Sequence, residues 1–254
     1  MESAGSPPYE RLAAIYDHVM RHVDYRSWAG YLRDLLARYG PSPASVIELA
    51  CGTGSVGLEA VRLKVPVVLA VDLCEAMLQV AREKALRAGI ALDFRRADLR
   101  DLSPVAPPSP FAAGFCVYDS FNYLLTPDDL RTALDQVHGI LSPGGLFIFD
   151  VCTERNSLRY FSDFEDREEG PGFSYERHSF YDARERLQMN RFRIRFEGEA
   201  APAEELHAQR IYPLAEVRAV VAESPFELVA AHDGFTFRKG SDQSDRVHFV
   251  IRSR

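Results

Sequence analysis

One short stretch, residues 45–57 (SVIELACGTGSVG), constrains the fold more than any other part of the chain. An apolar run rich in β-branched residues leads into a glycine turn, and apolar residues return at helical spacing from Leu58 onward. This pattern predicts a strand, a tight loop and a helix, which is how an α/β nucleotide-binding domain begins. Gly52 and Gly54 leave bare backbone against which a flat ligand can lie, and Gly57 permits close packing of the helix on the strand.

Three acidic residues at successive predicted strands narrow the choice of ligand. Glu48 lies inside the first strand, where an unpaired carboxylate is costly. Asp72 ends the apolar run 65–71, about 20 residues past the glycines, where an acid binds ribose hydroxyls. Asp98 follows a third strand, within reach of an adenine amino group. Because the glycine loop has no basic residue, these acids disfavour a phosphate-bearing ligand and favour a cationic cofactor.

Five motifs in order resemble those of class I methyltransferases that use S-adenosylmethionine (SAM), in their small-molecule branch. The motifs are residues 46–54 (VIELACGTG), 71–73 with Met77, 97–99, 118–124 (YDSFNYL) and 141–145 (LSPGG). The resemblance covers residues 9–152 closely and continues more loosely to the C-terminus. One departure is Ala112 at the start of the fourth strand, where family members often carry an acid.

The resemblance implies SAM as the cofactor and supplies most of the predicted site. The residues that it places at the cofactor are Tyr16, Tyr25, Trp28, Glu48, Ala50, Cys51, Gly52, Gly54, Asp72, Leu73, Met77, Asp98, Leu99 and Tyr118. A sulfonium is attracted to aromatic ring faces, which favours this role over plain packing against the core for Tyr16. For Tyr25 and Trp28 packing against the core is the favoured alternative. The residues expected to face the substrate are Asp119, Asn122 and Tyr123.

The general base is not evident from the sequence. Methyl transfer requires alignment and exclusion of water above all, and only a hydroxyl or carbon acid needs a strong base. We take Tyr16, Asn122 and His178 as the candidate catalytic residues. For His178 and His207 a surface or packing role is favoured over that of a base, and for Asp119 the alternative is capping of the following turn. Residues 118–124 lack Asn-Pro-Pro-Tyr, the signature of enzymes that methylate amide or exocyclic base nitrogens.

The order of predicted elements indicates a Rossmann-like, doubly wound α/β fold. Two helices within residues 9–39 precede the alternating strands and helices. Residues 153–171 are expected to form a loop or short helix, and three antiparallel strands of an inserted β-lid follow at 173–181, 187–196 and 205–212. The ending resembles that of a seven-stranded class I sheet with its last strand antiparallel. We therefore divide the chain into N-terminal helices with a SAM-binding core (1–152), a lid that binds substrate (153–212) and a completion of the core sheet (213–254).

Composition indicates the cellular setting. The formal net charge of -7 makes nucleic acid an unlikely partner. No apolar run approaches the ~20 residues of a membrane span, and residues 1–8 have no secretory pattern. Four scattered cysteines suit a reducing cytoplasm and lack the spacing of metal ligands.

One lid strand carries a row of arginines on one face, namely Arg191, Arg193 and Arg195. We expect this face to be solvated, or else to bind an anion or form a homodimer contact.

The sequence thus predicts a cytoplasmic SAM-dependent methyltransferase that needs no metal and methylates an N, O or C nucleophile of a small molecule. With its lid it resembles sugar N,N-dimethyltransferases and glycine N-methyltransferase. Three alternatives stay open: an RNA or protein methyltransferase, a non-catalytic SAM-binding module, and an NAD-linked oxidoreductase.

Overall fold

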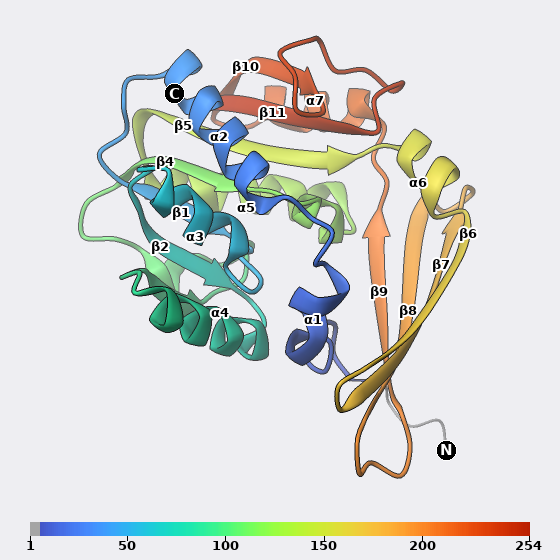
Figure 1. The fold of residues 1–254 in the computed structure, drawn as a ribbon. Helices are drawn as coiled ribbons and strands as arrows, with labels where there is room; N and C mark the ends of the chain where they lie inside the picture. The colour runs from blue at the N-terminus through green and yellow to red at the C-terminus, as the bar shows by residue number, and fades with distance from the viewer. Residues whose placement is uncertain (1–5) are drawn as a thin grey trace.

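The core of the molecule is a seven-stranded sheet with the order β10-β11-β5-β4-β1-β2-β3 (Figure 1). The computed structural model describes residues 6–254, so most of residues 1–8, which have no secretory pattern in the sequence, lies outside the described residues. All neighbouring strands are parallel except β11, which runs antiparallel to both β5 and β10. The strands are β1 (Val46–Leu49), β2 (Val67–Asp72), β3 (Asp93–Arg96), β4 (Phe111–Cys116), β5 (Leu141–Cys152), β10 (Phe226–Asp233) and β11 (Arg246–Ser253). The predicted class I sheet is confirmed.

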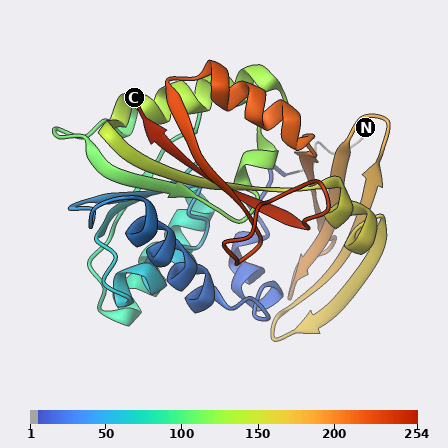
Figure 2. The ribbon, with the colours of Figure 1, turned by 90° about the horizontal axis from the view of Figure 1, so that it is seen from above.

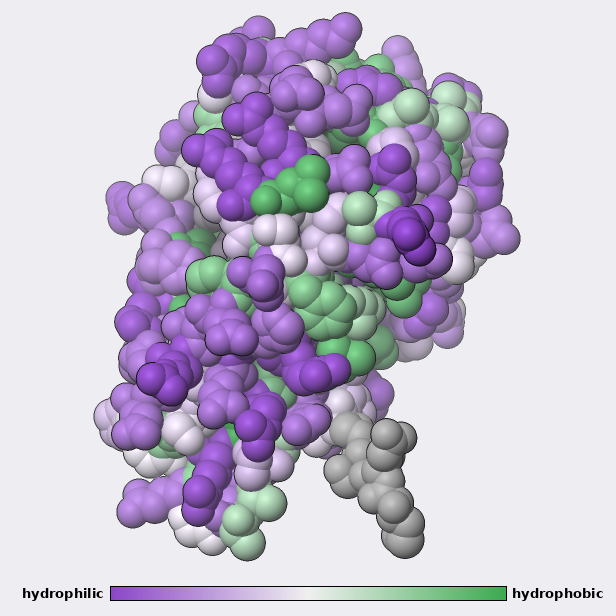
Figure 3. All heavy atoms as spheres, turned by 90° about the vertical axis from the view of Figure 1, so that its right-hand side faces the viewer, coloured by the Kyte–Doolittle hydropathy of each residue, from purple (hydrophilic) through white to green (hydrophobic). Residues whose placement is uncertain are grey.

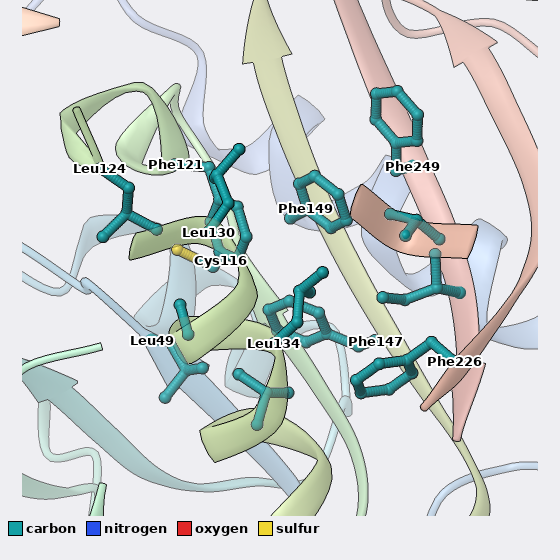
Figure 4. Close-up of a cluster of buried hydrophobic side chains, with 14 of the residues drawn as sticks. Leu49, Cys116, Phe121, Leu124, Leu130, Leu134, Phe147, Phe149, Phe226 and Phe249 are labelled. Atoms are coloured by element: carbon teal, nitrogen blue, oxygen red, sulfur yellow. The ribbon is translucent and has the colours of Figure 1, made fainter. Parts of the chain in front are cut away.

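Helices cover both faces of this sheet because its strands are apolar on both sides (Figure 2). One face is covered by α2 (Tyr25–Tyr39), α3 (Ser55–Arg62) and α4 (Glu75–Ala88). The other is covered by α5 (Pro127–Ile140) and α7 (Leu214–Glu223), over a cluster that includes the stacked rings of Phe147, Phe149 and Phe249 (Figure 4). These layers hold the carboxyl ends of the parallel strands in fixed positions.

The start of α5 is fixed by a reciprocal pair of hydrogen bonds. Thr126 accepts a hydrogen bond from the Asp129 amide, and the Asp129 carboxylate accepts one from the Thr126 amide, forming a capping box. A short 3-10 turn, η2 (Ser120–Tyr123), lies between β4 and this helix, and a second one, η1 (Ser103–Val105), precedes β4.

The insertion between β5 and α7 begins with α6 (Glu154–Tyr160) and continues as a four-stranded antiparallel sheet. Its strands are β6 (Asp163–Gly170), β7 (Phe173–Asp182), β8 (Leu187–Phe196) and β9 (Ala203–Arg210). The prediction of a loop or short helix at 153–171 was wrong in its second half, where every residue of β6 pairs with β7. We call this sheet the lid.

The two faces of the lid differ as the alternating sequence of β8 requires. Phe192 and Ile194 are buried against the short N-terminal helix α1 (Ala13–Val19), which lies between α4 and the lid (Figure 1). Arg191, Arg193 and Arg195 are exposed on the opposite face. Figure 3 shows that this side of the molecule is largely hydrophilic. Among residues 6–254, the helices are too short or too polar to cross a membrane.

Candidate functional site

A cavity of about 650 Å³ opens at the carboxyl ends of β1, β2 and β4, beneath the N-terminal segment. We call it the cofactor cleft. The predicted site residues that line it are Tyr16, Tyr25, Glu48, Ala50, Cys51, Gly52, Asp72, Leu73, Met77, Asp98, Leu99, Tyr118 and Tyr123. The structure therefore gathers residues from four of the five sequence motifs, together with the N-terminal Tyr16 and Tyr25, into one cleft.

Gly52 and Gly54 have different roles in the loop. Gly52 has a φ of +54°, and a Cβ added there would meet no described atom within 4 Å, because the position faces open space. Gly54 has a φ of +73° and lies at the N-cap of α3, where an added Cβ would come 3.1 Å from the ring of Phe94. Gly52 thus provides bare surface in the cleft, and Gly54 shapes the turn without lining it.

Glu48 is a buried carboxylate whose Oε2 atom has no hydrogen-bond partner within residues 6–254. Its side chain reaches the cleft and lies directly against Gly57, where any Cβ would collide with it. Burial raises the pKa of Glu48 to about 8, although a hydrogen bond from the Gly57 amide opposes the shift. A buried oxygen without a donor, at the wall of a cleft, suits a cationic N–H donor such as the ammonium group of SAM.

Asp72 joins the ends of two loops. Its Oδ2 accepts a hydrogen bond of 2.7 Å from the Gly52 amide, and its Oδ1 accepts one of 2.8 Å from the Cys74 amide. Each carboxylate oxygen keeps further acceptor capacity, and the side chain lines the cleft. Hydroxyl groups of a ribose would complete its hydrogen bonding. With Glu48 and the bare loop at Gly52, the donors and acceptors of this cleft fit SAM.

Asp98 lines the cleft, but its carboxylate is already engaged by a residue that sequence reasoning did not select. Arg100 donates from Nε at 3.0 Å and from Nη2 at 2.7 Å to the two oxygens, and this contact lowers the pKa of Asp98. An adenine amino group would have to share these oxygens with Arg100.

The N-terminal segment covers the cleft and is attached on both sides. Toward the core, Thr53 donates to Asp17 at 2.6 Å, and Lys84 pairs with the same carboxylate. Toward the lid, the buried carboxylate of Glu205 accepts hydrogen bonds from the backbone amides of Tyr9, Arg11 and Leu12. These contacts set the position of α1, which carries Tyr16.

A second cavity, of about 440 Å³, lies between the core and the lid. We call it the lid cavity. Asp119 lines it and is bound by Arg246 at 2.7 Å and by Gln209 at 2.5 Å. The two cavities share a wall of four tyrosines, namely Tyr9, Tyr16, Tyr118 and Tyr123.

Besides Gly54, three predicted site residues lie outside both cavities. Trp28 is buried in the core, where its ring packs 4.7 Å from that of Phe235 and carries the Arg246 guanidinium at 5.2 Å. Asn122 is fully buried between the two ends of the lid. His178 lies toward the outside of the lid and bonds to Asp163 on β6. The structure does not bring these side chains to the cofactor cleft.

Asn122 instead links the two points where the chain enters and leaves the lid. Its Oδ1 accepts a hydrogen bond of 3.0 Å from the Cys152 amide, at the end of β5. Its Nδ2 donates one of 2.7 Å to the Arg210 carbonyl, at the end of β9. The side chain that was expected to face the substrate thus fixes the base of the lid.

His207 was expected on a lid strand with a surface or packing role, but it belongs to a buried chain of polar groups. Its Nε2 lies 3.2 Å from Oε2 of Glu205, and its Nδ1 lies 3.2 Å from the Tyr123 hydroxyl. Because a carboxylate only accepts, we assign a hydrogen to Nε2, so that Nδ1 can accept one from the Tyr123 hydroxyl. Tyr123 in turn lies 2.5 Å from the hydroxyl of Tyr9. The chain runs from the shared tyrosine wall into the lid.

Comparison with known proteins gives a consistent result. Residues 46–145 match a family model described as a methyltransferase domain. YqeM of Bacillus subtilis (strain 168) is 29% identical over 244 residues, covering 95% of each chain. The dTDP-4-amino-2,3,4,6-tetradeoxy-D-glucose N,N-dimethyltransferase of Saccharopolyspora spinosa is 31% identical over 140 residues, covering 54% of this chain and 53% of that protein.

A solved structure shows the same fold over the whole chain. The S-adenosylmethionine-dependent methyltransferase from Clostridium acetobutylicum ATCC 824 has a TM-score of 0.78 and 21% identity, covering 96% of this chain and 98% of that one. The matched domain and the sheet order show that residues 46–145 form a methyltransferase domain of the class I fold, and the cleft at its strand ends fits SAM.

Proposed function

We propose that this enzyme transfers the methyl group of SAM to a nucleophile of a small molecule held in the lid cavity. The observation that carries the proposal is the wall of four tyrosines shared by the two cavities. A cofactor in one cavity and an acceptor in the other would meet at this wall. Alignment of the two reactants is the main task of the protein, because SAM supplies an activated leaving group when bound.

The cofactor would lie along the glycine loop. In this proposal Glu48 binds the ammonium group, Asp72 binds the ribose hydroxyls, and the bare backbone at Gly52 allows close approach. Tyr16, Tyr25 and Tyr118 place aromatic rings in the cleft, where they would attract the sulfonium and exclude water.

The acceptor would give up its proton toward the lid. Burial raises the pKa of Tyr9 well above its ordinary value, so the phenol stays neutral near pH 7 and cannot act alone as a base. The linked hydroxyls of Tyr9 and Tyr123 offer a route by which that proton reaches His207. The acidic partner Glu205 would stabilise the imidazolium that forms.

The relatives suggest the kind of acceptor. The protein from Saccharopolyspora spinosa is named for methylation of an amino sugar nucleotide, although the similarity covers only about half of each chain. We propose a compact acceptor with an amine or hydroxyl nucleophile. The net charge of -7 argues against a nucleic acid acceptor, and four free cysteines support a cytoplasmic enzyme. Homodimer formation stays a prediction that light scattering would test.

The experiment that tests the proposed function has two stages. A thermal-shift series with SAM, S-adenosylhomocysteine and NAD comes first, since a ligand at 100 times its Kd adds about 2.7 kcal/mol of stability. We expect a shift with the first two ligands and none with NAD. A panel of small amines and alcohols is then assayed for release of S-adenosylhomocysteine. Binding of SAM without turnover across amines and alcohols would favour the non-catalytic module.

A further inference from the structure

The lid cavity contains an arginine that forms no ion pair with any residue that the structure describes. Arg177 projects from β7 into this cavity and is half-buried there. Its Nε donates to the Ser179 hydroxyl at 2.9 Å, and its Nη2 donates to the Asn190 carbonyl oxygen at 3.0 Å. Both acceptors are neutral and buried, so they orient the guanidinium without neutralising it.

The other arginine of the lid cavity, Arg246, differs from Arg177 in its ion pairing. Arg246 forms ion pairs with Asp119 and Asp150, which balance its charge. Within residues 6–254, Arg177 has no carboxylate within 4.0 Å, and its Nη1 donates to no described residue. Because an unpaired buried charge is costly, a cation left in this state inside a cavity is suited to an anion that arrives from outside.

The surroundings of Arg177 strengthen this argument. Three phenylalanine rings lie around the guanidinium carbon, at 5.2 Å for Phe161 and 5.6 Å for both Phe164 and Phe192. The rings hold the planar group in place and keep water away from one side. An ion pair formed in such apolar surroundings is stronger than one formed at the protein surface.

We propose that Arg177 binds an anionic group, a carboxylate or a phosphate, of the methyl acceptor. The guanidinium would hold this group at the lid end of the cavity while the nucleophile lies at the tyrosine wall. The inference rests on the proposed function, because it assigns the lid cavity to the acceptor. It predicts that acceptors are small anionic molecules, and that neutral analogues bind weakly for lack of a two-pronged ion pair.

The test uses three probes that carry the same aromatic ring but differ in the charge of the attached group. Benzoate, phenyl phosphate and the neutral benzamide are titrated into the full-length protein saturated with S-adenosylhomocysteine. We expect at least one anion to bind about tenfold or more tightly than benzamide, a difference of about 1.4 kcal/mol. The tighter of the two anions identifies the source of the charge as a carboxylate or a phosphate.

Variants test whether the preference for the anion depends on Arg177 or on the positive charge of the lid in general. In Arg177→Met the preference for the anion over benzamide should disappear, and in Arg177→Lys it should be reduced, because lysine keeps the charge but loses the planar fork. Arg193→Met is the matched control, since Arg193 lies on the outer face of the same sheet and pairs with Glu176. Its anion binding should equal that of the wild type.

The result that overturns the proposal is equal binding of anion and benzamide by the wild type, or an undiminished preference in Arg177→Met. The wild-type comparison does not depend on the folding of any variant. Affinity for S-adenosylhomocysteine is measured in the same samples. If the protein binds the anion but not S-adenosylhomocysteine, the proposed function is contradicted and the anion site is supported. If it binds S-adenosylhomocysteine but shows no preference for the anion, only the anion site is contradicted.

Discussion

The hydroxyl oxygens of Tyr9 and Tyr123 lie 2.5 Å apart, although 114 residues separate them in the chain. One belongs to the N-terminal segment and the other to the turn after β4, so the contact closes the shared wall of the two cavities. Since Tyr123 also reaches His207, the pair joins the reacting region to a proton acceptor in the lid.

Replacement of Tyr123 by phenylalanine should therefore slow the chemical step. We expect Tyr123→Phe to lower kcat about 100-fold, the size of effect typical of a lost proton-transfer group. The affinity for SAM should be little changed, because the ring remains. Single-turnover kinetics with an acceptor found in the panel measure the first quantity and calorimetry the second.

The pH profile distinguishes a proton route from a merely positional role for Tyr123. If the hydroxyl carries the proton, the deficit of Tyr123→Phe should shrink at high pH, where the acceptor loses its proton to water. Tyr175→Phe is the matched control, because Tyr175 is a buried lid tyrosine that bonds to Asp166 outside both cavities. A deficit that is constant with pH would contradict the proton route.

Glu48 should release a proton when SAM binds. Its pKa of about 8 means that the free protein holds this side chain mostly protonated at pH 7. Contact with an ammonium group favours the carboxylate, so binding should release up to about one proton. Calorimetry at pH 7 in two buffers of different ionisation enthalpy measures this number. Equal release from the wild type and Glu48→Gln would show that Glu48 does not meet the ammonium group.

The same residue makes stability depend on pH. The pKa of Glu48 is raised from 4.5 to about 8 on folding, so the folded protein binds the extra proton in this range. Its contribution to stability is complete below pH 4.5 and is lost as the pH rises to 8. Relative to Glu48→Gln, the wild type should lose about 1.4 kcal/mol per pH unit across this window. Urea unfolding at pH 5 and pH 8 checks the sign, and a parallel profile for the two proteins would refute it.

Loss of the Asp72 carboxylate should weaken cofactor binding. Asp72→Ala removes the proposed acceptor of the ribose hydroxyls and frees the Gly52 amide, so we expect SAM to bind at least about tenfold more weakly, a loss of about 1.4 kcal/mol. Asp93→Ala is the control, since this exposed aspartate pairs with Arg95 on β3. Wild-type affinity in Asp72→Ala, measured by calorimetric titration, would remove Asp72 from the site.

Replacement of Asn122 should lower the stability of the protein more than its affinity for the cofactor. Asn122→Ala leaves the Cys152 amide and the Arg210 carbonyl without their partner, which costs about 1–3 kcal/mol of unfolding free energy. Chemical denaturation measures this loss, and exposed Gln243→Ala should leave stability unchanged. An unaltered unfolding free energy in Asn122→Ala would contradict its role at the base of the lid.

The core could be predicted from sequence because its signals are local. Apolar runs, the glycine turn and the Thr126 cap each act within a few residues, and strand ends of a parallel sheet converge on one edge. The residues of the cofactor cleft follow from that convergence. Strand β6 carries no such signal, since its eight residues (DFEDREEG) are mostly charged and lie at the lid edge, where pairing with β7 alone decides the conformation.

The lid cavity could not be predicted because its contacts are distant in sequence. The proposed role of His207 depends on its contact with Tyr123, which lies 84 residues away in the chain. The direction of Asn122 depends on Arg210, which is equally remote. Position after a strand limits where a residue lies, but it does not determine whether the side chain points to a ligand or to the backbone of an insertion.

The position of Asn122 has a consequence for how such enzymes diverge. The lid leaves the core after Cys152 and returns at Arg210, and one amide side chain holds these two points together. An insertion whose ends are joined in this way can be exchanged as a unit, since the core sheet on either side is continuous without it. Substrate choice can then change by replacement of residues 153–210, provided that the new lid keeps the carboxylate of Glu205, which holds the N-terminal segment over the cofactor cleft. A chimaera that carries such a lid on this core should retain SAM binding and acquire a new acceptor.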